Sequence, residues 1–272
     1  MMYKPIIYYD FILESRLMYS KQIEVYVDRF PKVPTPISTI RIVILSEPHI
    51  ISELLPLVQG KKDWYDYVFT YYEPLLQTND KAVKFIGPQP WVRNYNFPEK
   101  EFSVSTVVGG KRMKGLPGHV MRHELWHARH RILVPKKFYL SSLSKYEGAD
   151  YDNNLVLHGT KYPLFDSMFH IAIENISLQN MFSEKILDCF QAKTVPIYYG
   201  APNIGDDFDI DGILVADSVE DIIKICNELT PKLYEYMLDS IEANYLLSNK
   251  WISFNDNLDN TIEKTLTGCI RL

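Results

Sequence analysis

Short apolar segments alternate with amphipathic ones along the chain, and this pattern predicts an α/β protein. Buried strands are indicated by β-branched or aromatic runs at residues 41–45, 67–70, 102–108, 169–173, 195–198 and 212–215. Helices are indicated at residues 50–58, 118–131 and 183–192, after the capping residue Ser218, and from Pro231. Strands that alternate with helices at these lengths predict parallel, doubly wound, Rossmann-like sheets.

The segment between Phe85 and Phe97 interrupts this alternation. It carries two prolines and a glycine among aromatic residues, which is typical of an irregular connection. A chain of 272 residues is long enough for two domains. We therefore predict an α/β domain over residues 1–98 and a second Rossmann-like domain over residues 99–272, with a ligand cleft between them. The last helix is free to pack back on the first domain.

Composition and charge narrow the class of protein. With 46% hydrophobic and 23% charged residues the chain is an ordinary globular protein, and a net charge of -5 argues against nucleic-acid binding. The three cysteines form no CxxC pair, which fits a reducing compartment. Residues 1–10 lack the basic flank and apolar run that are typical of a signal peptide, and no apolar run reaches the length of a membrane span. We expect a cytoplasmic protein, soluble or peripherally associated with a membrane.

Two strand-to-helix connections have the composition of an anion site. The loop at residues 109–118 carries three basic residues and leads into a helix that contains Arg122. The loop after Glu174-Asn175 leads into a helix that begins Ser183-Glu184-Lys185. Free N–H groups and the helix dipole attract phosphate at such places. A glycine-rich turn and a charged first helical turn are also common without any ligand, so this pattern alone leaves the function open.

Residues 169–204 contain an ordered set of motifs. The strand ends in Glu174-Asn175, the helix begins Ser183-Glu184-Lys185, and Thr194-Val195-Pro196 and Tyr198-Tyr199-Gly200 follow without gaps. This segment resembles the donor-binding segment of the family 10 glycosyltransferases, the α1,3/1,4-fucosyltransferase family.

Two positions upstream of this segment also resemble the family, and one position within it differs from the family's pattern. Arg122 stands where the family keeps an arginine for the donor phosphates, and Ser46-Glu47-Pro48 is similar to the segment with the catalytic glutamate. Met181 stands where the family commonly has a tyrosine. A hydrogen bond to the donor is therefore not expected at that position.

The resemblance implies an inverting transfer of fucose from GDP-fucose to a hydroxyl of an oligosaccharide or glycoconjugate. It also implies a fold of the GT-B type, with the donor in the C-terminal domain, the acceptor on the N-terminal side and no obligatory metal or other cofactor. The attacking hydroxyl must lose its proton, and the resemblance makes Glu47 the catalytic base. Another GDP-sugar as donor, or a catalytically silent sugar-nucleotide-binding protein, remains an alternative.

The same resemblance implies how the donor is held. Arg122 and Lys185 would balance the charge that develops on the leaving diphosphate, helped by the helix start at Ser183. Glu184 would accept hydrogen bonds from the ribose hydroxyls, and Asn175 would orient a phosphate or the sugar.

A second motif competes with this interpretation. Residues 123–127 read His-Glu-Leu-Trp-His, the helical H-E-x-x-H signature of zinc peptidases. His119 and His130 lie on the same helix, and Glu147 could supply a third ligand. The cationic neighbour Arg122 disfavours a divalent ion here, so we expect no metal and treat the peptidase as the less favoured alternative.

Overall fold

The computed structural model describes residues 2–9, 15, 17–48, 52–142, 145–146 and 154–268. The chain forms two compact units, one made of residues 1–88, 179–181 and 253–272, the other of residues 89–178 and 182–252. The first unit thus ends at Pro88 rather than at residue 98, and it includes the C-terminal helix. The boundary falls early because the amides of Trp91 and Val92 bond to Asp188 of the second unit.

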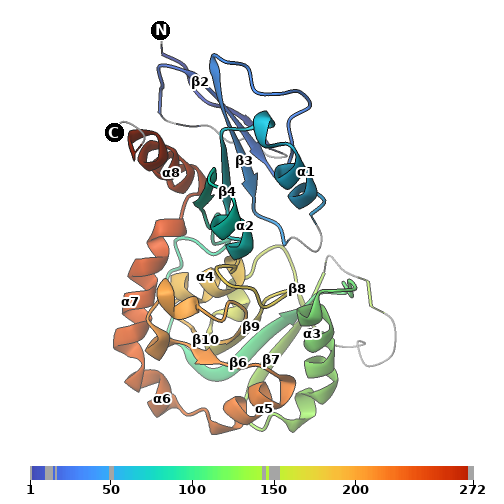
Figure 1. Ribbon diagram of the computed structural model, residues 1–272. Helices are drawn as coiled ribbons and strands as arrows, with labels where there is room; N and C mark the ends of the chain where they lie inside the picture. Colours follow the sequence, from blue (N-terminus) through green and yellow to red (C-terminus); the bar gives the residue numbers. More distant parts are fainter. Residues whose placement is uncertain are drawn as a thin grey trace. The chain divides into compact units, whose positions relative to one another are not determined.

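The first unit is built on a parallel sheet whose strands follow one another in chain order (Figure 1). The strands are β1 (Ile6–Tyr8), β2 (Gln22–Val27), β3 (Thr39–Leu45), β4 (Tyr67–Thr70) and β5 (Ala82–Lys84). The helices of this unit are α1 (Leu54–Gly60), α2 (Glu73–Thr78) and α8 (Phe254–Gly268).

Alternation along β3 gives this sheet a core on each face. Ile42 and Ile44 pack in a cluster that includes Leu258 and Ile262 of α8. The opposite face carries Val43, which packs in a cluster with residues of α1 and α2. Because both faces of the sheet are covered, the strand is almost continuously apolar, and it could therefore be predicted from the sequence.

The second unit contains a six-stranded parallel sheet in the order β11-β10-β9-β6-β7-β8 (Figure 1). The strands are β6 (Glu101–Val108), β7 (Lys136–Ser141), β8 (Leu155–Leu157), β9 (Ser167–Ile173), β10 (Val195–Tyr199) and β11 (Leu214–Val215). The α-helices are α3 (Pro117–Ala128), α4 (Glu184–Gln191), α5 (Val219–Glu228), α6 (Pro231–Tyr236) and α7 (Leu238–Ser248). The chain starts in the middle at β6, runs outward to β8 and returns at β9, so the strand order reverses between β6 and β9. Doubly wound sheets bind ligands at this reversal.

These sheets confirm the predicted pair of Rossmann-like units, with several local differences. The sequence did not indicate β1, β2, β5, β7, β8 or α2. The expected strand at residues 212–215 begins only at Leu214, after a 3-10 turn at Ile210–Gly212. The helix expected from Pro231 ends at Tyr236, and a second helix starts at Leu238. Of the helix expected at residues 50–58, residues 50 and 51 lie outside the described part of the chain.

Throughout the described ranges, none of the helices combines the length and apolar character needed to cross a membrane.

The first turn of α3 lies directly against the backbone at the end of β9. Gly118 donates its N–H to the carbonyl oxygen of Asn175 at 2.9 Å. A Cβ at Gly118 would lie 1.7 Å from the carbonyl oxygen of Glu174, well inside van der Waals contact. A glycine is therefore required at this point of close backbone approach.

We expect Gly118→Ala to destabilise the second unit by about 1–3 kcal/mol or more, because the added methyl must push α3 away from β9. Urea unfolding measures this change. The control is Gly205→Ala, where a Cβ would meet only an ordinary contact at 3.7 Å. Equal unfolding midpoints for the two variants would contradict the close approach.

Candidate functional site

A cavity of about 560 Å³ lies in the second unit, at the reversal of strand order. Its walls come from the ends of β6, β7, β8 and β9, the loop before β9 and the first turn of α4, and they include Thr106, Ser141, Leu157, Ile173 and Lys185. Because all the strands are parallel, their carboxyl ends gather at one edge of the sheet. The cavity therefore occupies the place where this fold class binds ligands.

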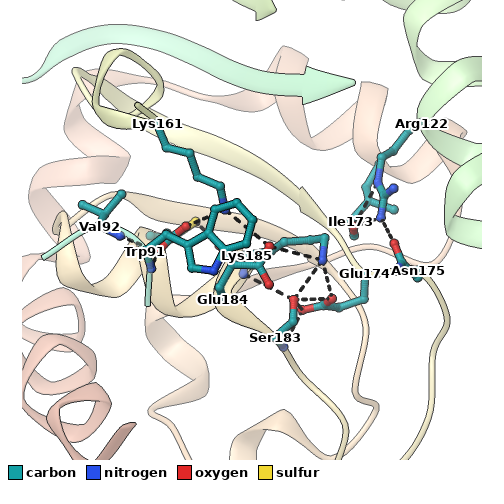
Figure 2. Close-up of polar contacts among 12 residues, drawn as sticks. Trp91, Val92, Arg122, Lys161, Ile173, Glu174, Asn175, Ser183, Glu184 and Lys185 are labelled. Carbon is teal, nitrogen blue, oxygen red and sulfur yellow. Dashed lines mark hydrogen bonds and ion pairs between the residues drawn. The ribbon is translucent and has the colours of Figure 1, made fainter. Parts of the chain in front are cut away.

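A buried carboxylate joins the end of β9 to the start of α4. Glu174 accepts hydrogen bonds from the Ser183 N–H at 2.8 Å and the Ser183 hydroxyl at 2.7 Å, and from Lys185 Nζ at 3.3 Å (Figure 2). Ser183 caps α4 by accepting from the Lys185 N–H. Burial alone would lower the pKa of Lys185, but the Glu174 and Glu184 carboxylates raise it. Lys185 therefore stays cationic at the rim of the cavity.

The motif residues after α4 support the same carboxylate. The Glu174 N–H donates to the carbonyl oxygen of Tyr199 at 2.7 Å. A Cβ at Gly200 would lie 2.7 Å from Cγ of Glu174 and 2.1 Å from the Tyr198 hydroxyl. The glycine of the Tyr-Tyr-Gly motif therefore leaves room for Glu174 to lie in place.

Arg122 reaches the end of β9 from α3. Its Nε and Nη2 donate to the carbonyl oxygen of Ile173 at 3.1 and 2.7 Å, and Nη2 also donates to Asn175 Oδ1 at 2.6 Å (Figure 2). The guanidinium is held in one orientation and lines the cavity. The structure thus brings Arg122, Asn175, Ser183, Glu184 and Lys185 together around one strand end.

Lys161 is part of this cluster, although the sequence did not indicate it. Its ammonium donates to Glu184 Oε1 at 3.3 Å and to Asp188 Oδ2 at 2.8 Å. Burial alone would raise the pKa of Glu184, but the ammonium groups of Lys185 and Lys161 lower it to about 2. A single lysine in the loop after Gly159 carries no sequence signal, because only folding places it beside α4.

His170 adds a neutral acceptor to the cavity wall. The Ser105 hydroxyl donates to the carbonyl oxygen of Leu164 at 2.6 Å and lies 2.8 Å from His170 Nδ1. With the serine proton used in this way, Nδ1 is the protonated ring nitrogen and Nε2 carries the lone pair. Burial, together with the charge of Lys161, lowers the pKa of His170 to about 3. The ring is therefore uncharged at neutral pH.

Glu47 belongs to the first unit, directly after β3, with an exposed side chain. Its N–H donates to Asp28 Oδ1 at 3.2 Å, and its carbonyl oxygen accepts from the Tyr71 hydroxyl at 3.2 Å. Asp28 has a φ of 48° and also accepts the Ser46 N–H at 2.9 Å. Residues after β2 and β4, the two strands beside β3, thus hold the backbone of Glu47.

The H-E-x-x-H motif has a different environment from a zinc site. His123 is buried with Arg112 Nη2 at 3.3 Å from its Nδ1, whereas His127 is exposed. Burial and the Arg112 charge lower the pKa of His123. In the described ranges no three His, Cys, Asp or Glu side chains gather in a way that could hold a metal ion. Glu147, which could supply a third ligand in the peptidase alternative, lies outside these ranges.

Comparison with known proteins gives no matching family model and no matching curated protein. Solved structures do match. A crystal structure of an α1,3-fucosyltransferase with GDP-fucose aligns with a TM-score of 0.51 at 15% identity, over 87% of this chain and 77% of that one. TarM aligns with a TM-score of 0.57 at 10% identity, over 89% and 54%. The pneumococcal O-GlcNAc transferase GtfA, solved with UDP and GlcNAc, aligns with a TM-score of 0.52 at 12% identity, over 92% and 57%.

These neighbours are GT-B glycosyltransferases, and the chain has their fold of two parallel Rossmann-like units. Because the sequence identities are this low, the likeness to these structures establishes the fold alone.

Glu184 should give the protein a specific acid sensitivity. Its pKa is lowered from the ordinary 4.5 to about 2, so the stability that its ionised form contributes is present above about pH 4.5 and is lost as the pH falls toward 2. We expect Glu184→Gln to lose less stability than the wild type between about pH 5 and pH 3, measured by urea unfolding. Glu220→Gln is the control, because its exposed pair with Arg131 is screened by solvent. An identical acid loss in the wild type and Glu184→Gln would contradict this assignment.

Proposed function

We propose that this protein is a glycosyltransferase of the family 10 type that moves fucose from GDP-fucose to a hydroxyl of a glycan acceptor. The observation that carries the proposal is the strand end at β9, where Arg122, Lys185 and an ionised Glu184 line one cavity. The ordered motif that resembles the family's donor segment supports it. A structural neighbour solved with GDP-fucose supports the choice of donor.

The cavity suits the leaving group of such a reaction. As the glycosidic bond breaks, negative charge develops on the diphosphate and must be met by fixed positive charge. The Arg122 guanidinium, held through Nε and Nη2 by Ile173 and Asn175, places a fixed positive charge beside the phosphate oxygens, and Lys185 adds a point charge at the N-terminus of α4. Glu184 accepts hydrogen bonds from the ribose hydroxyls, and Asn175 orients a phosphate or the sugar. With these cations supplied by the chain, the proposed mechanism requires no metal.

The acceptor step needs a base. The acceptor oxygen attacks the anomeric carbon, the new glycosidic bond forms, the bond to the diphosphate breaks, and the acceptor proton passes to the Glu47 carboxylate. Attack from the side opposite the diphosphate inverts the configuration. The bonds from Asp28 and Tyr71 to the Glu47 backbone support this role, because a base must be held in position.

Calorimetry with GDP tests the donor site. We expect micromolar binding that is unchanged by EDTA and at least roughly tenfold weaker in Lys185→Ala, since a charge-assisted phosphate contact is lost. Lys224→Ala, which removes an exposed lysine on α5 outside the cavity, should bind like the wild type. Absence of GDP binding together with stoichiometric zinc in the purified protein would overturn the proposal in favour of the histidine motif at residues 123–127.

Glu47→Gln tests the chemical step. We expect the transfer rate from GDP-fucose to fall by about 100-fold or more, with GDP affinity unchanged, because the amide cannot take the acceptor proton. Glu53→Gln changes another exposed glutamate of the same unit and should leave the rate unchanged. Full activity in Glu47→Gln would exclude it as the base. GDP binding without transfer to any acceptor in the wild type would favour a silent binding protein.

A further inference from the structure

Trp91 is a large exposed aromatic ring on the wall of the cavity. Its side chain is 67% exposed, whereas Trp126 and Trp251 are buried in the protein interior. An exposed indole in a concave site marks a surface available for a ligand, because it leaves a wide apolar face in water.

The backbone at Trp91 is firmly attached to the second unit. The N–H groups of Trp91 and Val92 both donate to Asp188 Oδ1, at 2.6 and 2.9 Å. Asp188 is fully buried on α4, the helix that also carries Glu184 and Lys185. The backbone of Trp91 is therefore fixed relative to the helix whose residues are proposed to hold the donor.

One face of the indole is already occupied. The ammonium of Lys161 lies 4.1 Å from the centroid of the ring, and the same ammonium donates to Glu184 and Asp188 (Figure 2). This cation–π contact restrains the ring, since Lys161 is itself tied to two carboxylates.

A chain of contacts orders these residues along the cavity. Lys185 lies 3.7 Å from Glu184, Glu184 lies 3.3 Å from Lys161, and Lys161 lies beneath Trp91. If Lys185 contacts the diphosphate and Glu184 the ribose, the next group of a nucleotide along this line is its base. This order rests on the proposed function.

We propose that the face of Trp91 turned away from Lys161 stacks on the nucleobase of the donor. Stacking on an aromatic ring contributes about 1–3 kcal/mol per base and accepts any base, so Trp91 supplies affinity rather than a choice of base. Lys161 acts as a positioning residue, holding the ring on one side and the ribose-binding carboxylate on the other.

The test compares a ligand with a base to one without it. We expect Trp91→Ala to weaken GDP binding about tenfold or more in calorimetry, and to leave the affinity for ribose 5-diphosphate unchanged. Trp91→Phe should retain most of the GDP affinity, because a smaller ring still stacks. Tyr236→Ala, which removes an exposed aromatic ring on α6 outside the cavity, is the matched control and should bind both ligands like the wild type.

The outcomes separate this inference from the function on which it rests. Wild-type GDP affinity in Trp91→Ala, or an equal loss for both ligands, overturns the stacking role while the proposed donor site stands. A wild-type protein that binds neither GDP nor ribose 5-diphosphate overturns the donor site itself.

Discussion

The buried carboxylate of Glu174 is the interaction on which the cavity depends. It lies at the end of β9, yet it accepts hydrogen bonds from the backbone and hydroxyl of Ser183 and from the ammonium of Lys185. A buried charge is stable only when it is paired and hydrogen-bonded, so these partners cannot be removed one at a time without a large cost. One side chain therefore sets the distance between a strand end and the helix that follows it.

The helix α3 is fixed to the same strand end by a different means. Gly118 allows its first turn to touch the backbone after β9, and Arg122 then reaches Ile173 and Asn175. Two helices from distant parts of the chain thus converge on one strand end. Their polar groups meet there because parallel strands place all their carboxyl ends at one edge of the sheet.

Charges around the cavity alternate in sign. Lys185 lies between Glu174 and Glu184, and Lys161 lies between Glu184 and Asp188. The two lysines lower the pKa of Glu184 to about 2, and the carboxylates hold the lysines in place. Such a network is organised before any ligand arrives, which reduces the ordering that binding would otherwise require.

The sequence by itself determined the class of fold and the composition of one strand end. Strands buried on both faces, such as β3 and β9, can be recognised from a short, continuous apolar run. The start of α4 can be recognised from its capping residue Ser183, because helix capping depends on only a few neighbouring residues. Three features could not be predicted locally and depend on the tertiary structure: the strand β2, which has polar residues on one face, the need for a glycine at position 118, and the partners of Lys161. Each depends on a neighbour far away in the chain, and no local pattern of residues encodes that neighbour.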